Sequence, residues 1–194
     1  FYNEIEDPIE SVILASAEIG LTSFVNAELA ENVGVEFELY KTLDFLEERW
    51  GWGQTWERFY INTNFAWIDS EITLSEDNSA IQTSDQRPLQ GQSPYVWNFQ
   101  VGYDDEDRDI NAALLFNMFG ERIVDVGVNG APDIYEEPRP SLDFVYSHGF
   151  DSWKLKIKLK NLLDPDIELT QGKETTRKFS VGSEFSIAAQ FRFD

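Results

Sequence analysis

The sequence predicts an all-β protein, an antiparallel up-and-down transmembrane β-barrel of which about eight strands are present. Three observations predict this fold. Polar and apolar residues alternate along a series of segments, and the connections between those segments alternate in length. In addition, no window of roughly 18 consecutive apolar residues could form a transmembrane helix. The longest alternating segment, residues 177–193, exceeds the usual strand length of about 5–6 residues in globular domains.

Each predicted strand has apolar side chains at every second position, as expected for a strand with one apolar and one polar face. The clearest case is 153–160, where lysines alternate with one tryptophan and three aliphatic residues. We expect the strand around 33–40 to begin further back, near Thr22. The predicted strands are residues 1–6, 33–40, 59–67, 95–104, 110–118, 142–147, 153–160 and 177–193.

Short turns at 104–108 and 149–152 lie between long connections at 75–93, 129–138 and 164–176. Outer-membrane barrels have this asymmetry, with short turns at one rim and long loops at the other. Aromatic residues also gather near the predicted short-turn rim, which indicates a girdle in the headgroup zone. They are Phe45, Trp50, Trp52, Trp56, Phe59, Tyr103, Phe150, Trp153, Phe191 and Phe193.

Packing decides which face points inward. Side chains already fill the interior of an eight-stranded barrel, so large rings such as Phe65, Trp97 and Phe116 would crowd it, whereas lipid accepts them. We therefore expect the apolar face to meet lipid and the polar face to line a lumen. There, the lysines of 153–160 could pair with carboxylates of a plug or of the wall. The wall carboxylates are Glu36, Glu38, Asp143 and Glu184.

Composition narrows the function classes. A formal charge of -21 disfavours nucleic acid as a partner, because phosphates require a basic face. A mean hydropathy of -0.38 fits alternating strands. The chain has no cysteine and one histidine, His148, so neither a thiolate nor a multi-histidine metal site can form. His148 stands at a strand end near a short turn, so we do not expect a histidine-based catalytic triad. We predict no enzymatic activity and no cofactor.

Several motifs resemble TonB-dependent outer-membrane receptors, especially Bacteroidetes-like ones. The segment Arg87-Pro-Leu-Gln-Gly-Gln-Ser-Pro-Tyr95 resembles the one that precedes a late barrel strand in that family. Shorter matches follow in the family's order along essentially the whole chain, at 7–10, 26–36, 131–139 and 160–165. The resemblance implies that residues 1–194 are the C-terminal portion of a 22-stranded plugged barrel. The plug domain and the earlier strands would lie outside this sequence.

The resemblance also implies a function and partners. The protein would be a receptor and transporter in the outer membrane of a Gram-negative bacterium. It would take up a scarce nutrient, such as a metal chelate (a siderophore complex, for example), a vitamin or a glycan. Its partners would be outer-membrane lipid, the nutrient, and TonB through the absent N-terminal region. Whether a surface lipoprotein covers the barrel stays open.

Ligand contacts are expected in the long loops and upper lumen, because loops on a rigid scaffold carry recognition. The candidates are Gln82, Arg87, Gln90, Asp133, Tyr135 and Glu136. Asp164, Asp166 and Glu168 place three carboxylates at alternate positions, a candidate for a calcium site of hard oxygen ligands. In the family, however, the segment 160–165 mainly ends a strand.

Two alternatives remain open from the sequence. One is a self-contained eight-stranded outer-membrane barrel with a structural or adhesive role. The other is a soluble, lipocalin-like binding barrel, whose apolar face would point inward around a cavity. Periodicity alone does not separate these alternatives, because the alternation is the same whichever face is inside.

Overall fold

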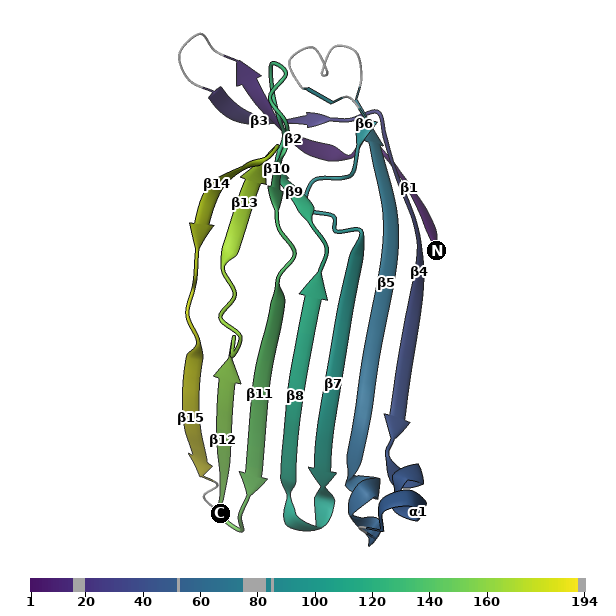
Figure 1. The fold of residues 1–194 in the computed structure, drawn as a ribbon, viewed down its shortest axis with the longest axis vertical. Helices are drawn as coiled ribbons and strands as arrows, with labels where there is room; N and C mark the ends of the chain where they lie inside the picture. The colour runs from purple at the N-terminus through teal and green to yellow at the C-terminus, as the bar shows by residue number, and fades with distance from the viewer. Residues whose placement is uncertain (16–19, 52, 75–82, 85, 192–194) are drawn as a thin grey trace.

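The computed structural model describes residues 1–15, 20–51, 53–74, 83–84 and 86–191. Its main sheet has nine antiparallel strands, eight of which lie side by side nearly in sequence order (Figure 1). The prediction of about eight sequential antiparallel strands is confirmed. Their order is β1 (Tyr2–Glu6), β4 (Leu29–Thr42), β5 (Phe59–Thr73), β7 (Tyr95–Asp105), β8 (Ile110–Phe119), β11 (Pro140–Gly149), β12 (Trp153–Lys160) and β15 (Glu184–Phe191), with β6 (Gln86–Arg87) paired to β5.

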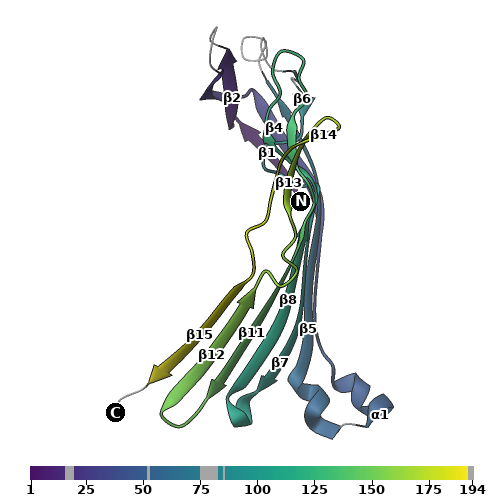
Figure 2. The same cartoon turned by 60° about the vertical axis from the view of Figure 1, so that its left-hand side comes forward.

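The sheet is open within the described residues, because β1 and β15 are its two edges and do not pair with each other. β1 pairs only with residues 29–33 of β4. The lower part of β4 therefore has β5 as its one strand partner in the described part of the chain. The fold is a curved wall and not a closed cylinder (Figure 2).

The two ends of the sheet differ. At the end we call the short-turn end, η3 (Glu106–Arg108) joins β7 to β8, and three residues join β11 to β12. The connection from β4 to β5 lies at the same end but is longer, and it contains η1 (Asp44–Leu46), α1 (Glu47–Trp50) and η2 (Gly53–Arg58). None of the helices in the described residues is long and apolar enough to cross a membrane.

The opposite end, the loop end, carries additional sheets. Between β1 and β4 along the chain comes a hairpin of β2 (Ile9–Ala15) and β3 (Gly20–Asn26), which forms a separate sheet. A second sheet has the order β14 (Glu174–Phe179), β13 (Ile167–Gln171), β10 (Ile134–Glu136) and β9 (Arg122–Asp125). The predicted alternation of short and long connections is therefore confirmed, apart from residues 43–58.

The strand register keeps each face in phase across the sheet. Phe99 lies opposite Thr63 and Phe116, whereas its neighbour Asn98 lies opposite Asn64 and Asn117. Directly paired residues point to the same side of a sheet. One side, the apolar face, thus carries the aromatic and aliphatic side chains, and the other, the polar wall, carries the amides and lysines.

Many side chains of the apolar face are exposed. Phe37 is 56%, Trp67 51% and Phe185 64% exposed. The buried apolar cluster instead lies at the loop end, where Ala30, Ile72 and Leu74 pack together. A soluble monomer rarely leaves so many large apolar side chains uncovered.

Two strand predictions were wrong. The expected single strand 177–193 is divided into β14 and β15, because Gly182 adopts a φ of 78° and leaves the extended conformation. The Nδ2 atom of Asn161 donates to the Gly182 carbonyl at 2.9 Å, and the Gly182 amide donates to Asp164 at 2.9 Å. Likewise, the strand expected from Thr22 onward is divided into β3 and β4 by a turn at residues 27–28.

Candidate functional site

Amide side chains form a row across the polar wall. Asn64, Asn98 and Asn117 lie on consecutive strands directly opposite one another, and the Nδ2 atom of Asn117 donates to the Asn98 Oδ1 atom at 2.8 Å. The row lines a hollow of about 250 Å³ that also reaches Gln100 and Asp143. Each amide supplies both donors and an acceptor, so the hollow can bind uncharged polar groups in several orientations.

The lysines of β12 stand on the same wall. Lys154 pairs with Asp109 at 3.0 Å, and Lys160 pairs with Glu184 at 3.6 Å. Among the described residues, Glu184 is the one of the four predicted lysine partners that forms an ion pair with a lysine of β12. Lys156 and Lys158 are exposed and form no ion pair with any described residue. These two ammonium groups are therefore free to bind an anionic group, although the chain as a whole is strongly acidic.

The predicted ligand residue Arg87 is buried in an ion pair at the loop end. Its Nη2 atom lies 3.0 Å from the Glu10 Oε2 atom, and the two side chains are 2% and 6% exposed. The Arg87 Nη1 atom donates to the Pro88 carbonyl. Arg87 belongs to β6 and Glu10 to β2, so this ion pair links the β2–β3 hairpin to the main sheet.

Glu136 is held by two arginines. Its Oε2 atom accepts a hydrogen bond from Arg122 at 2.6 Å, and its Oε1 atom accepts one from Arg139 at 3.1 Å. Both guanidinium groups also lie over the ring of Phe119, at 4.5 and 5.4 Å from its centroid. Burial would raise the pKa of Glu136, but the hydrogen bonds from Arg122 and Arg139 lower it overall.

The other predicted ligand residues lie nearby. Gln90 donates to the Val124 carbonyl, and the carboxylate of Asp133 accepts from the Gly127 amide at 2.7 Å. Tyr135 lines a hollow of about 210 Å³. Burial, with the charge of Asp133, raises the pKa of the Tyr135 hydroxyl. Gln82 lies outside the described residues.

The three carboxylates of the candidate calcium site do not converge on one point. Asp164 accepts from Gly182 at the break in the last strand, whereas Asp166 and Glu168 both pair with Lys178, at 3.3 and 3.1 Å. Hydrogen bonds from Thr175 and Lys178 lower the pKa of Glu168. No group of three acidic or histidine side chains in the described part of the chain could hold a metal ion.

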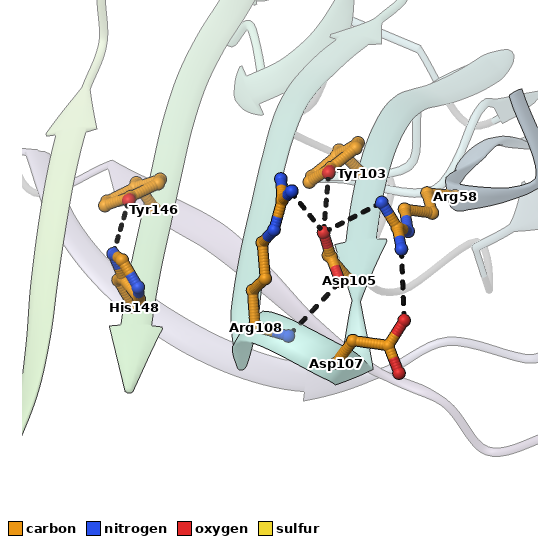
Figure 3. A network of polar contacts seen from close by, with 7 residues as sticks. All are labelled: Arg58, Tyr103, Asp105, Asp107, Arg108, Tyr146 and His148. Atoms are coloured by element: carbon orange, nitrogen blue, oxygen red, sulfur yellow. Dashed lines mark hydrogen bonds and ion pairs between the residues drawn. The ribbon is translucent and has the colours of Figure 1, made fainter. Parts of the chain in front are cut away.

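A network of hydrogen bonds and ion pairs lies at the short-turn end, centred on Asp105 (Figure 3). The Asp105 carboxylate is fully buried and receives the Arg58 guanidinium at 3.1 Å, the Tyr103 hydroxyl at 3.0 Å and the Arg108 amide at 3.2 Å. Arg58 also reaches Asp107 at 3.1 Å. Sequence reasoning missed this network, because an acidic turn such as 104–109 is typical of a solvated connection.

Rings predicted to form the aromatic girdle contact one another at the same end. His148 joins them, with a ring nitrogen 3.2 Å from the Tyr146 hydroxyl and its ring stacked on Phe150 at 4.2 Å. Phe150 stacks on Trp153 at 4.3 Å, and Trp153 on Phe191 at 6.3 Å. The structure thus gives His148 a packing role. Trp52 and Phe193, predicted members of the girdle, lie outside the described residues.

No protein-family model and no curated protein matches this sequence. Solved structures match its fold. The copper transporter OprC matches with a TM-score of 0.65 and 16% identity, over 99% of this chain and 28% of its own length. The FrpB iron transporter from Neisseria meningitidis (F3-3 variant) matches with a TM-score of 0.59 and 11% identity, over 99% of this chain and 27% of its own. The chain therefore shares its fold with part of each of these two transporters, and it spans little more than a quarter of the length of either one.

Proposed function

We propose that residues 1–194 are the C-terminal portion of an outer-membrane, TonB-dependent transporter that takes up a scarce nutrient in a Gram-negative bacterium. The observation that carries this proposal is the separation of the two faces. Exposed rings cover one side of the sheet, and amides and lysines cover the other, in one register from β4 to β15. Such a wall suits lipid on one side and a hydrated passage on the other.

The open edges favour a portion of a larger barrel over a complete small one. A self-contained barrel needs its first and last strands to pair, because an unpaired edge exposes backbone groups that lipid does not satisfy. The lower part of β4 and the outer edge of β15 lack such partners among the described residues. The exposed rings of the apolar face likewise count against a soluble barrel.

We infer that the nutrient contains a metal ion, as a chelate. Two of the matching solved structures are, by their names, transporters of copper and iron. A chelate with polar groups at its surface suits the amide row of the polar wall. At the loop end, we propose that Arg87 and Glu136 hold the loops in place. Gln90, Asp133 and Tyr135 would then be the residues that contact an arriving ligand.

Contacts with TonB would be made by residues outside this chain.

Uptake by cells that produce the full-length protein tests the proposal. We expect radiolabelled iron or copper chelates to enter only when TonB and a proton gradient are present. The double variant Asn64→Leu/Asn98→Leu should reduce uptake while leaving the amount of folded protein in the outer membrane unchanged. Leu114→Ile, on the apolar face, is the matched control and should not affect uptake. Recovery of the protein in the soluble fraction, or uptake indifferent to TonB, would refute the proposal.

A further inference from the structure

Two arginines, Arg122 and Arg139, stand where the polar wall meets the loop end. Arg122 begins β9 and Arg139 directly precedes β11, and β9 and β10 lie at the loop end of β8 and β11 (Figure 1). Both guanidinium groups lie over the ring of Phe119, the last residue of β8. Phe119 is two residues beyond Asn117 in the same strand and therefore shares the polar wall with it. The arginines thus lie beside the amide row, on its loop-end side.

Glu136 holds both guanidinium groups in place. Its Oε2 atom accepts from the Nε and Nη2 atoms of Arg122 at 2.9 and 2.6 Å, and its Oε1 atom accepts from the Arg139 Nε atom at 3.1 Å. The Glu136 side chain is 8% exposed, so water competes little for these charge-assisted bonds. Because one carboxylate meets two guanidinium groups, the cluster retains an uncompensated positive charge.

Arg139 has hydrogen-bond donors that the fold does not use. A guanidinium group has five N–H donors, and Glu136 takes the one on the Nε atom of Arg139. The two Nη groups of Arg139 make no hydrogen bond or ion pair with any described residue. The Arg139 side chain is 27% exposed, so a solute can reach these donors. Paired Nη groups match the two oxygens of a carboxylate.

A molecule bound at Arg139 would meet uncharged polar groups and further cations along the polar wall. The hollow beside the amide row extends to Ser141, two residues after Arg139, and Ser141 lies opposite Asn117. On the short-turn side of the amide row, Lys156 and Lys158 are exposed and form no ion pair with any described residue. Open cations therefore stand on both sides of the amide row, although the chain is acidic as a whole.

We propose that Arg139, with Arg122 beside it, binds a carboxylate of the transported nutrient at the loop end of the polar wall. The nutrient is then an anionic chelate, whose uncharged polar groups face the amide row. The bond to Glu136 and the contact with Phe119 fix the Arg139 guanidinium before a ligand arrives, so binding costs little ordering of this side chain. This role rests on the proposed function, because it requires the polar wall to face the passage.

Titration of the full-length protein in detergent with citrate tests the site. Citrate supplies carboxylates without a metal ion, and its neutral trimethyl ester is the control ligand. Arg139→Met removes the open donors and leaves Glu136 its two hydrogen bonds from Arg122. We expect this variant to bind citrate about tenfold more weakly, because it loses charge-assisted hydrogen bonds. Arg177→Met, at an exposed position of β14, is the matched control and should bind citrate as the unmodified protein does.

Arg139→Lys separates ligand binding from a structural role. Lysine keeps the positive charge without the planar fork, so we expect an affinity for citrate between those of the unmodified protein and Arg139→Met. Hydrogen exchange in β9 and β10 should be the same in Arg139→Lys as in the unmodified protein. If both variants lose citrate binding equally and exchange faster in β9 and β10, Arg139 only supports the loops, and the inference is overturned.

The remaining outcomes separate the inference from the proposed function. The inference is also overturned if citrate does not bind the unmodified protein, if Arg139→Met binds it equally well, or if the neutral ester binds as tightly as citrate. In each of these cases the uptake experiment still decides the proposed function. Citrate binding that depends on Arg139, together with uptake that is indifferent to TonB, would refute the proposed function and leave a carboxylate site without a role in uptake.

Discussion

The long strands and the loop end are held together by opposite means. In the long strands β5, β7, β8, β11 and β12, each residue has a partner set by the register, and several large apolar side chains, such as Phe65, Trp67 and Trp97, remain exposed. The loop end has a buried apolar cluster and a buried ion pair between Glu10 and Arg87, which are 77 positions apart. A repeated residue pattern is therefore enough to form the long strands, whereas the loop end depends on a few specific contacts between distant residues.

The largest expected effect is a loss of stability at the loop end when the Glu10–Arg87 ion pair is broken. Arg87→Met leaves the Glu10 carboxylate buried without its partner, and breaking such a pair costs about 3–5 kcal/mol. Hydrogen exchange should become faster in β2, β3 and β6 and stay unchanged in β11 and β12. The double variant Arg87→Met/Glu10→Leu should recover much of the loss, because it leaves no buried charge. Equal loosening of β11 and β12 would mean that the two regions unfold as one unit.

Glu136 gives the loop end a dependence on pH. Its pKa is lowered from 4.5, so the stabilisation is fully present above pH 4.5 and is lost as the pH falls through the lowered value. Glu136→Gln should cost about 1.5–3 kcal/mol at neutral pH, because it weakens charged hydrogen bonds. The variant should also remove this acid-dependent step.

Pepsin cleavage at β9 and β10, followed as the pH is lowered below 4.5, measures the step. Glu174→Gln, at an exposed position of β14, is the matched control and should behave as the unmodified protein. An acid step of unchanged size in Glu136→Gln would assign the pH dependence to another carboxylate.

The smallest effect is expected where the two regions meet. Gly182→Ala places a side chain at a φ of 78°, which costs about 1–2 kcal/mol, although the added methyl group would have open space. Hydrogen exchange of the β14–β15 junction should become faster, whereas Ser186→Ala within β15 should have no effect. If Gly182→Ala leaves exchange unchanged, the hydrogen bonds from Asn161 and to Asp164 hold the break without help from the glycine.

The sequence predicted the wall well because alternation with a period of two is a local signal. Asn98 and Phe99 belong to opposite faces whatever strand pairs with them. The break at Gly182 was missed for the same reason, since glycine there occupies a polar position in an unbroken alternating run. Only the contacts with Asn161 and Asp164, which are distant in sequence, show that the strand ends.

The loop end could be predicted only in part. The motif around Arg87 was singled out, but its partner Glu10 carries no local mark that distinguishes it from the other acidic residues of an acidic chain. Asp105 was hidden in the same way within the acidic run 104–109. Both carboxylates become identifiable only in the folded chain, where Arg87 lies beside Glu10 and Arg58 lies beside Asp105.

The common register of the long strands limits how their lengths can change during evolution. Inserting one residue into the middle of β8 would turn Asn117 onto the apolar face and Phe116 onto the polar wall, and would exchange the faces for the remainder of that strand. Insertions of two residues, or a bulge that absorbs one, would keep the faces in place. We expect homologous chains to vary in single steps beyond the ends of these strands, and mainly in pairs within them.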